Sequence, residues 1–152
     1  MKKQCNPEEL KHLRHLCRQA SNKTRKLIPK LKEMHGPTAW YDPNSLECLC
    51  AISAGLLFTA MKSDYPEVRL AVRSSDIEGH SFILYKGLRL DPTAMQFGAP
   101  GPLVEPHITR DAPSHYQRAK QFSCLQAFNE YLKKQKWPAE QRPDFLVESL
   151  NA

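Results

Sequence analysis

The pattern of apolar and polar positions predicts helices in the first part of the chain. Residues 6–9 provide an asparagine cap, a proline suited to the first helical turn and a capping-box glutamate. Apolar residues then recur at helical spacing, and this helix is expected to end near Asn22. A second helix is predicted from Thr24 to Met34, with a kink at Pro29.

The most apolar segment, from Leu46 to Met61, is predicted to form a buried central helix, because it is long and rich in small residues. Alternating apolar and polar positions then predict three short strands, over 68–73, 79–85 and 88–91. A turn at Lys86-Gly87 is expected to join the second strand to the third as an antiparallel hairpin.

The rest of the chain predicts a loop and a last helix. The stretch 92–113 contains five prolines and two glycines, so no regular element is expected there. Ser114 is predicted to cap a helix that ends at Trp137-Pro138 and whose inward residues are Tyr116, Ala119, Phe122, Leu125, Phe128 and Leu132. This order of elements predicts an α+β fold, in a single domain over residues 1–152.

The composition agrees with a folded domain. The chain has 152 residues, of which 41% are hydrophobic, and no apolar run is long enough for a membrane span. The first residues lack the apolar stretch of a signal peptide. Five cysteines are too few, and odd in number, for a disulfide framework. A cytoplasmic location is therefore expected, and export without a cleavable signal remains an alternative.

The net charge of +6 is concentrated at one end of the chain. Residues 1–35 contain ten Lys or Arg and three Glu, whereas the other 117 residues contain 12 basic and 13 acidic side chains. Such a basic helical region is suited to an acidic partner, although a solvated helix surface is the simpler interpretation. Nucleic acid is not the expected partner, because no aromatic residues alternate with the charges.

Three residues of chemical interest lie on three predicted elements: Cys50 on the central helix, His80 on the second strand and Asp91 at the end of the third. Paired strands lie about 5 Å apart, so the hairpin is expected to bring His80 close to Asp91. His80, Phe82 and Leu84 are expected to share one face of the sheet, and a helix packed on that face would present Cys50 to His80. An imidazole beside a thiol forms a thiolate–imidazolium pair, and a carboxylate on the other ring nitrogen orients it.

The sequence around these residues resembles the transglutaminase-like branch of the papain-type cysteine enzymes. The similar segments lie within residues 44–98 and are Cys50–Leu57, Pro66–Arg69, Gly79–Phe82 and Leu90–Thr93. The run Asp91–Gly98 is similar to the ending seen in small bacterial members. This sequence departs from the family in the short spacing from His80 to Asp91, and in Phe82, where many members have tryptophan.

The resemblance implies a papain/transglutaminase-like fold, in which a central helix bearing the cysteine packs on a small antiparallel sheet with flanking helices. It also implies a Cys–His–Asp triad of Cys50, His80 and Asp91. Family members include transglutaminases, peptidases, amidases and glutamine deamidases, so the activity implied is acyl transfer from an amide.

Other roles for these residues stay open. Cys50 is also compatible with an inert core cysteine, His80 with a buried core histidine and Asp91 with a turn former. Cys48 is an alternative nucleophile, but the small residues that follow match the family pattern only when counted from Cys50. His107 and His115 are weaker candidates for the base.

Asn44 has two interpretations. The resemblance implies that its amide helps to hold the oxyanion, together with the backbone N–H of Cys50. Alternatively, Asn44–Glu47 forms a capping box, and the helix then begins at Asn44. If a loop runs to about Leu49 instead, Cys50 lies at the positive end of the helix dipole. Gln96 and Trp40 are further candidates for lining the cleft.

The predicted function is therefore that of a thiol hydrolase, either a glutamine deamidase or a peptidase, acting on a protein or peptide. The chemistry requires no metal or organic cofactor. A zinc site of Cys48, Cys50 and His80 is not expected, because no second pair of ligands is present. One alternative is a non-enzymatic binding module of the same fold, which uses its basic N-terminal helices to bind nucleic acid or a partner protein. Another is a leader-peptide or isopeptide protease with the same site.

Overall fold

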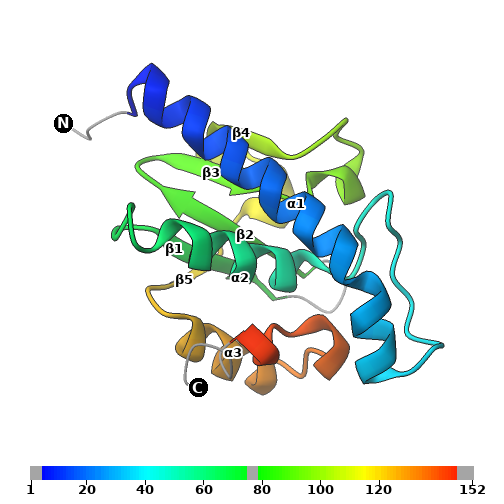
Figure 1. Ribbon diagram of the computed structural model, residues 1–152. Coiled ribbons are helices and arrows are strands. Elements are labelled where there is room, and N and C mark those ends of the chain that lie inside the picture. The colour runs from blue at the N-terminus through cyan, green and yellow to red at the C-terminus, as the bar shows by residue number, and fades with distance from the viewer. Residues whose placement is uncertain (1–4, 75–78, 147–152) are drawn as a thin grey trace.

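A five-stranded antiparallel sheet forms the centre of the computed structural model, which describes residues 5–74 and 79–146 (Figure 1). The strands lie in the order β4-β3-β2-β1-β5, and every neighbouring pair is antiparallel. Their bounds are β1 (Arg69–Arg73), β2 (His80–Tyr85), β3 (Leu88–Asp91), β4 (Leu103–Pro106) and β5 (Lys120–Phe122). The three strands predicted from the sequence are confirmed to within one residue at each end.

Three α-helices accompany the sheet within the described residues: α1 (Pro7–His35), α2 (Cys50–Met61) and α3 (Leu125–Lys134). In Figure 1, α1 crosses the sheet in blue, α2 runs beside it in green over β1 and β2, and α3 lies at the bottom of the view. The predicted α+β fold class is confirmed. None of the helices in the described ranges has the length and apolar character that a membrane crossing needs. Short 3-10 helices occupy Ala94–Phe97, Thr109–Asp111, Ser114–Tyr116 and Ala139–Gln141.

The two faces of the sheet are covered differently. On one face, Leu70 and Ile83 belong to the main buried cluster, together with residues of all three helices. On the other face, Ala71 and Phe82 pack with Tyr116 in a smaller cluster. The register pairs Leu70 with Ile83 and Ala71 with Phe82, so the two sets of side chains point in opposite directions.

The prediction of two N-terminal helices is wrong, because α1 runs unbroken from Pro7 to His35. Its predicted start is confirmed: Oδ1 of Asn6 accepts a hydrogen bond of 2.8 Å from the backbone N–H of Glu9. Buried residues recur every three or four positions through the expected break near Asn22, so core packing maintains the helix there. Pro29 lies on the exposed side of α1, where a missing amide donor is tolerated.

Two predictions about the second half of the chain are also wrong. The stretch 92–113 was expected to lack regular structure, yet it contributes β4, which pairs with β3. Ser114 does not cap a long helix: it begins a 3-10 turn, the chain then forms β5, and α3 begins only at Leu125. The physical reason is the same in both places. A strand edge has unpaired backbone groups, and pairing with β4 or β5 satisfies them.

Candidate active site

A turn held by a carboxylate precedes α2. Asp42 accepts a hydrogen bond of 2.8 Å from the backbone N–H of Asn44 and another of 2.9 Å from the hydroxyl of Ser45. These bonds, the first of them most strongly, lower the pKa of the Asp42 carboxyl. Asn44 and Ser45 therefore belong to this turn, and the prediction that Asn44–Glu47 caps the central helix is wrong.

The same turn contains two residues with unusual backbone angles. Leu46 has a φ of 57° and Cys48 a φ of 70°, which are left-handed values that favour glycine. The side chains of Leu46 and Leu49 are fully buried, and this anchoring to the core compensates for the backbone strain. Left-handed residues do not continue into a right-handed helix, so the predicted start at Leu46 is wrong and α2 begins at Cys50.

The N-terminus of α2 carries no side-chain cap. Leu49 occupies the capping position and cannot accept a hydrogen bond from the first turn, which also contains no acidic residue. Backbone N–H groups at such a helix start favour a negative charge nearby, because they lie at the positive end of the helix dipole. Of the two alternatives left open by the sequence, the structure therefore has the one in which Cys50 lies at the dipole's positive end.

His80 and Asp91 form a buried pair. Nε2 of His80 lies 2.7 Å from Oδ2 of Asp91, and neither side chain is exposed to solvent. The hairpin explains the contact, since the register pairs Ile83 with Leu90 and, when continued, places Asp91 across from Phe82. His80 is two residues from Phe82 on the same face, so the pair is a diagonal neighbour pair across two strands.

Other donors complete the shell of Asp91. The hydroxyl of Tyr116 donates to Oδ2 at 2.6 Å, and the backbone N–H of Thr93 donates to Oδ1 at 3.0 Å. The Thr93 hydroxyl lies 3.3 Å from the same oxygen. A buried carboxylate needs such partners, because burial without them disfavours its charge. Both oxygens of Asp91 are thus engaged, and the carboxylate is held in one orientation.

The pKa values of this group favour a charged pair. Burial alone lowers the pKa of His80, but the Asp91 carboxylate and the hydrogen bonds with Asp91 and Cys50 outweigh it and raise that pKa to about 10. Burial raises the pKa of Asp91, whereas the charge of His80 and the bonds from His80, Tyr116 and Thr93 bring it below its ordinary value. Burial and the nearby Asp91 charge raise the pKa of Tyr116, so its hydroxyl remains a donor.

Cys50 completes the arrangement. Its side chain is close enough to His80 to help raise the pKa of that ring, through a side-chain hydrogen bond and through charge. Nε2 is bonded to Asp91, which leaves Nδ1 as the ring nitrogen open to the thiol proton. The expected route was wrong, however: the helices pack on the Ile83 face, whereas His80 shares the face of Phe82. Cys50 and His80 are each the first residue of their element, so they approach each other where α2 and β2 begin.

Aromatic rings enclose the imidazole of His80. The ring centroids of Phe97, His115, Tyr116 and Phe82 lie 4.7, 5.5, 5.6 and 5.9 Å from its own. Phe97 and His115 also stack on each other, with centroids 3.6 Å apart. This packing excludes water from the ring and restricts its rotation, which strengthens its interaction with Asp91.

Gln96 is a further polar residue at the imidazole. Its Nε2 lies 3.3 Å from Nδ1 of His80 and donates to the hydroxyl of Thr93 at 2.9 Å. The sequence suggested that Gln96 lines the cleft, and the structure places it beside the ring nitrogen that is not bonded to Asp91. The same hydroxyl approaches Asp91, so Gln96 connects the two ends of the His80–Asp91 pair.

The remaining candidates lie around this group. Cys48 is half-buried on the turn before α2, and burial, followed by the charges of Glu47 and Cys50, raises its pKa. Asn44 is exposed on that turn, and its role at the oxyanion stays a prediction. Trp40 is 58% exposed. His107 lies 3.5 Å from Nη1 of Arg89 and is not part of the Cys50–His80–Asp91 contact chain described above.

Sequence reasoning missed two residues of the site. Thr93 had a local signal, because an Asx turn commonly forms when an aspartate is followed two residues later by a backbone donor. Tyr116 had none: it was predicted as a core residue of the last helix, and it reaches Asp91 from 25 residues away. Within the described residues, no cluster of three or more His, Cys, Asp or Glu side chains is arranged as a metal site.

Comparisons of the chain with protein-family models, with curated proteins and with solved structures found no match.

Proposed function

We propose that this protein is a cysteine-dependent amide acyl-transfer enzyme of the hydrolase type. Cys50 is the nucleophile, His80 is the general base and then the general acid, and Asp91 orients the imidazole. The observation that carries the proposal is the meeting of Cys50, at the uncapped start of α2, with the fully buried His80–Asp91 pair.

The reaction follows from the positions of the protons. Nε2 of His80 donates to Asp91, so Nδ1 accepts the thiol proton and a thiolate–imidazolium pair forms. The thiolate attacks the amide carbonyl, and the backbone N–H groups at the start of α2 stabilise the oxyanion. The imidazolium then protonates the leaving nitrogen and leaves a thioester. Water, deprotonated by His80, attacks the thioester and releases the acid and the free thiol.

The substrate in this proposal is a protein or peptide. Hydrolysis, rather than cross-linking to a second substrate, is the reaction proposed. The leaving group is then ammonia from a glutamine side chain or the amine of a peptide or isopeptide bond. The triad chemistry uses no metal or organic cofactor, and a cytoplasmic location remains part of the prediction.

The test compares two cysteines of opposite exposure. Cys124 is exposed, whereas Cys50 is 5% exposed, so accessibility alone would make Cys124 the faster thiol. With an imidazolium beside it, Cys50 is expected to react with iodoacetamide about tenfold faster than Cys124 at about pH 6. Peptide mass spectrometry after timed quenching measures both rates in one sample.

Two variants separate the proposed mechanism from a merely reactive thiol. His80→Ala should remove the preference for Cys50, and Asp91→Asn should weaken it. Cys48→Ala is the matched control and should leave the preference unchanged. A slower reaction of Cys50 than of Cys124 at every pH, in the folded parent chain, would contradict the proposal.

The alternative is a non-enzymatic binding module of the same fold that uses its basic N-terminal region. Arg14 and Arg18, which are exposed on α1 and form no ion pair within the described residues, favour it. In that case binding of an acidic partner survives Cys50→Ala and His80→Ala, and Cys50 shows no preferential labelling.

A further inference from the structure

A groove runs along α1 where the helix faces the segment 95–104. One hollow of about 230 Å³ is lined by Arg18, Arg25, Asn44, Met95 and Pro102, among others. A second, of about 220 Å³, is lined by Arg14, Cys17, Arg18, Pro102, Leu103 and Val104. The two hollows share Arg18 and Pro102, so they lie next to each other, and together they are called the groove here.

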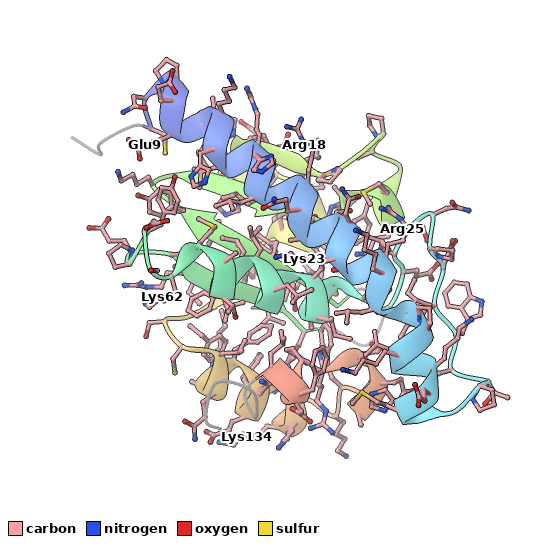
Figure 2. The ribbon with its side chains drawn as sticks, viewed as in Figure 1. Glu9, Arg18, Lys23, Arg25, Lys62 and Lys134 are labelled. Atoms are coloured by element: carbon pink, nitrogen blue, oxygen red, sulfur yellow. The ribbon has the colours of Figure 1, made fainter. Side chains whose placement is uncertain are left out.

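Three arginines give this groove its charge. At 100° per residue, Arg14, Arg18 and Arg25 fall within about 40° of one another around α1. Figure 2 shows Arg18 and Arg25 on the border of α1 next to the yellow-green segment that precedes and includes β4. None of the residues lining the two hollows is acidic.

The charges of these arginines are not used inside the fold. Within residues 5–74 and 79–146, none of the three forms an ion pair. Arg25 is nevertheless held in place, because its Nε donates to the carbonyl of Pro43 at 2.6 Å and its Nη1 to Oδ1 of Asn22 at 3.1 Å. An oriented guanidinium with no carboxylate of its own is suited to bind one from a ligand.

One end of the groove is lined by residues from the two segments that also carry residues of the proposed active site. Met95 precedes Gln96, whose amide lies 3.3 Å from Nδ1 of His80. Asn44 lies on the turn that leads into Cys50. A chain lying along α1 from Arg14 to Arg25 would therefore approach the residues that surround the thiol.

We infer that this groove binds an acidic segment of the polypeptide substrate, next to the amide that Cys50 attacks; the inference rests on the proposed function. Each hollow is smaller than the ~300–1,000 Å³ of most small-molecule pockets, which suits successive side chains of an extended peptide. A nucleic acid fits less well, because no aromatic residue lines the hollows for base stacking.

The experiment uses two peptides that carry the same chloroacetamide electrophile. One is a short run of glutamates, and in the other each glutamate is replaced by serine. The quantity measured is the ratio of the two rates of Cys50 alkylation, followed by mass spectrometry at low salt. The acidic probe is expected to react about tenfold faster, and the ratio should fall as salt is added.

Charge-reversal variants locate the effect. Arg18→Glu combined with Arg25→Glu should bring the ratio close to one, in a chain whose circular dichroism matches the parent. Lys23→Glu is the matched control on the same helix: it lies about 140° around α1 from Arg18, and its label in Figure 2 is on the side toward α2. Lys134→Glu, on α3, is the distant control. Both controls should retain the ratio of the parent.

Each contrary outcome has a separate meaning. A ratio near one in a parent chain whose Cys50 reacts selectively with iodoacetamide overturns the acidic groove and leaves the proposed function standing. The double variant changes the net charge by −4 and Lys23→Glu changes it by −2, so a loss in the Lys23 variant that is about half of the Arg18/Arg25 loss shows attraction by net charge only and also overturns it. Tighter binding of a single-stranded oligonucleotide than of the acidic peptide also overturns the acidic groove. If Cys50 is unreactive, binding tests the groove instead. The fluorescein-labelled acidic peptide is titrated with the Cys50→Ala chain, and the fluorescence anisotropy of the peptide is measured.

Discussion

The two long helices α1 and α2 begin in opposite ways. α1 starts with an asparagine whose side chain accepts the N–H of Glu9, with a proline next and two glutamates in the first turn. α2 starts after a buried leucine, with no cap and no acidic residue in its first turn. The positive end of α1 is thus balanced by its own residues, whereas that of α2 is left without an anionic partner from its own first turn.

This difference has a chemical consequence. An uncapped helix start is costly where it serves only as structure, since a cap contributes about 1 kcal/mol. At α2 the missing cap leaves backbone donors beside the sulfur of Cys50, where a thiolate and an oxyanion would need them. The strained turn at Leu46 and Cys48 lies at the same place. The start of α1 is therefore built for stability, whereas the start of α2 leaves backbone donors free for the reaction proposed above.

The largest expected effect comes from removing the Asp91 carboxylate, which is bonded to the imidazole of His80. Asp91→Ala leaves His80 buried without a counterion and deprives Tyr116 of its acceptor. We expect the free energy of unfolding to fall by about 3–5 kcal/mol, the usual cost of breaking a buried charged pair. Urea unfolding followed by circular dichroism measures it. Asp111→Ala, which breaks an ion pair of exposed side chains, is the control and should cost at most about 1 kcal/mol.

The pH dependence of stability should show the same charged pair. The pKa of His80 is raised from 6.5 to about 10, so folding favours its protonated form. Its contribution is complete below about pH 6.5 and is lost as the pH rises toward 10. The pKa of Asp91 is lowered, so its contribution is present above its unfolded value and is lost on acidification. The urea midpoint should therefore fall as the pH rises from about 6.5 toward 10, and it should also fall on acidification.

His80→Gln identifies the alkaline part of that decline. The variant lacks the titrating imidazole, so the fall attributable to His80 between about pH 6.5 and 10 should disappear. An alkaline decline of the same size in parent and variant would assign it to other groups. It would also mean that the charged state of the His80–Asp91 pair contributes nothing to stability.

The smallest effects come from the two turns that begin the helices. Asn6→Ala and Asp42→Ala should each lower the free energy of unfolding by about 1 kcal/mol, since each removes a side chain that accepts backbone hydrogen bonds. Only Asp42→Ala should also reduce the preference of iodoacetamide for Cys50 over Cys124, because that turn positions Cys50. Equal reductions in both variants would refute the contrast between the two helix starts.

Local sequence signals were sufficient where neighbouring residues determine the structure. The cap at Asn6 and the hairpin around Lys86-Gly87 follow from residue preferences and alternation, and both are present. The start of α2 was not predictable in this way. Asn44 and Ser45 look like helix caps in sequence, but Asp42 binds them in a turn that depends on the burial of Leu46.

The candidate site shows the same division. Cys50, His80 and Asp91 were selected from residue type, order and a resemblance, whereas Tyr116 came to Asp91 through a long-range contact that no local pattern indicates. The face on which α2 packs was predicted wrongly as well. Which of two sheet faces a helix covers depends on the total apolar area that each face buries, which is a property of the whole domain.

The sequence by itself determined the α+β class, the central hairpin, the first helix start and the basic character of α1, because each depends on residues that are neighbours in the chain. Tertiary structure decided where α2 begins, how Cys50 reaches His80, which groups surround Asp91 and where the arginines of α1 meet the segment 95–104. These features depend on contacts between distant residues, and their energies are settled only when the core is packed.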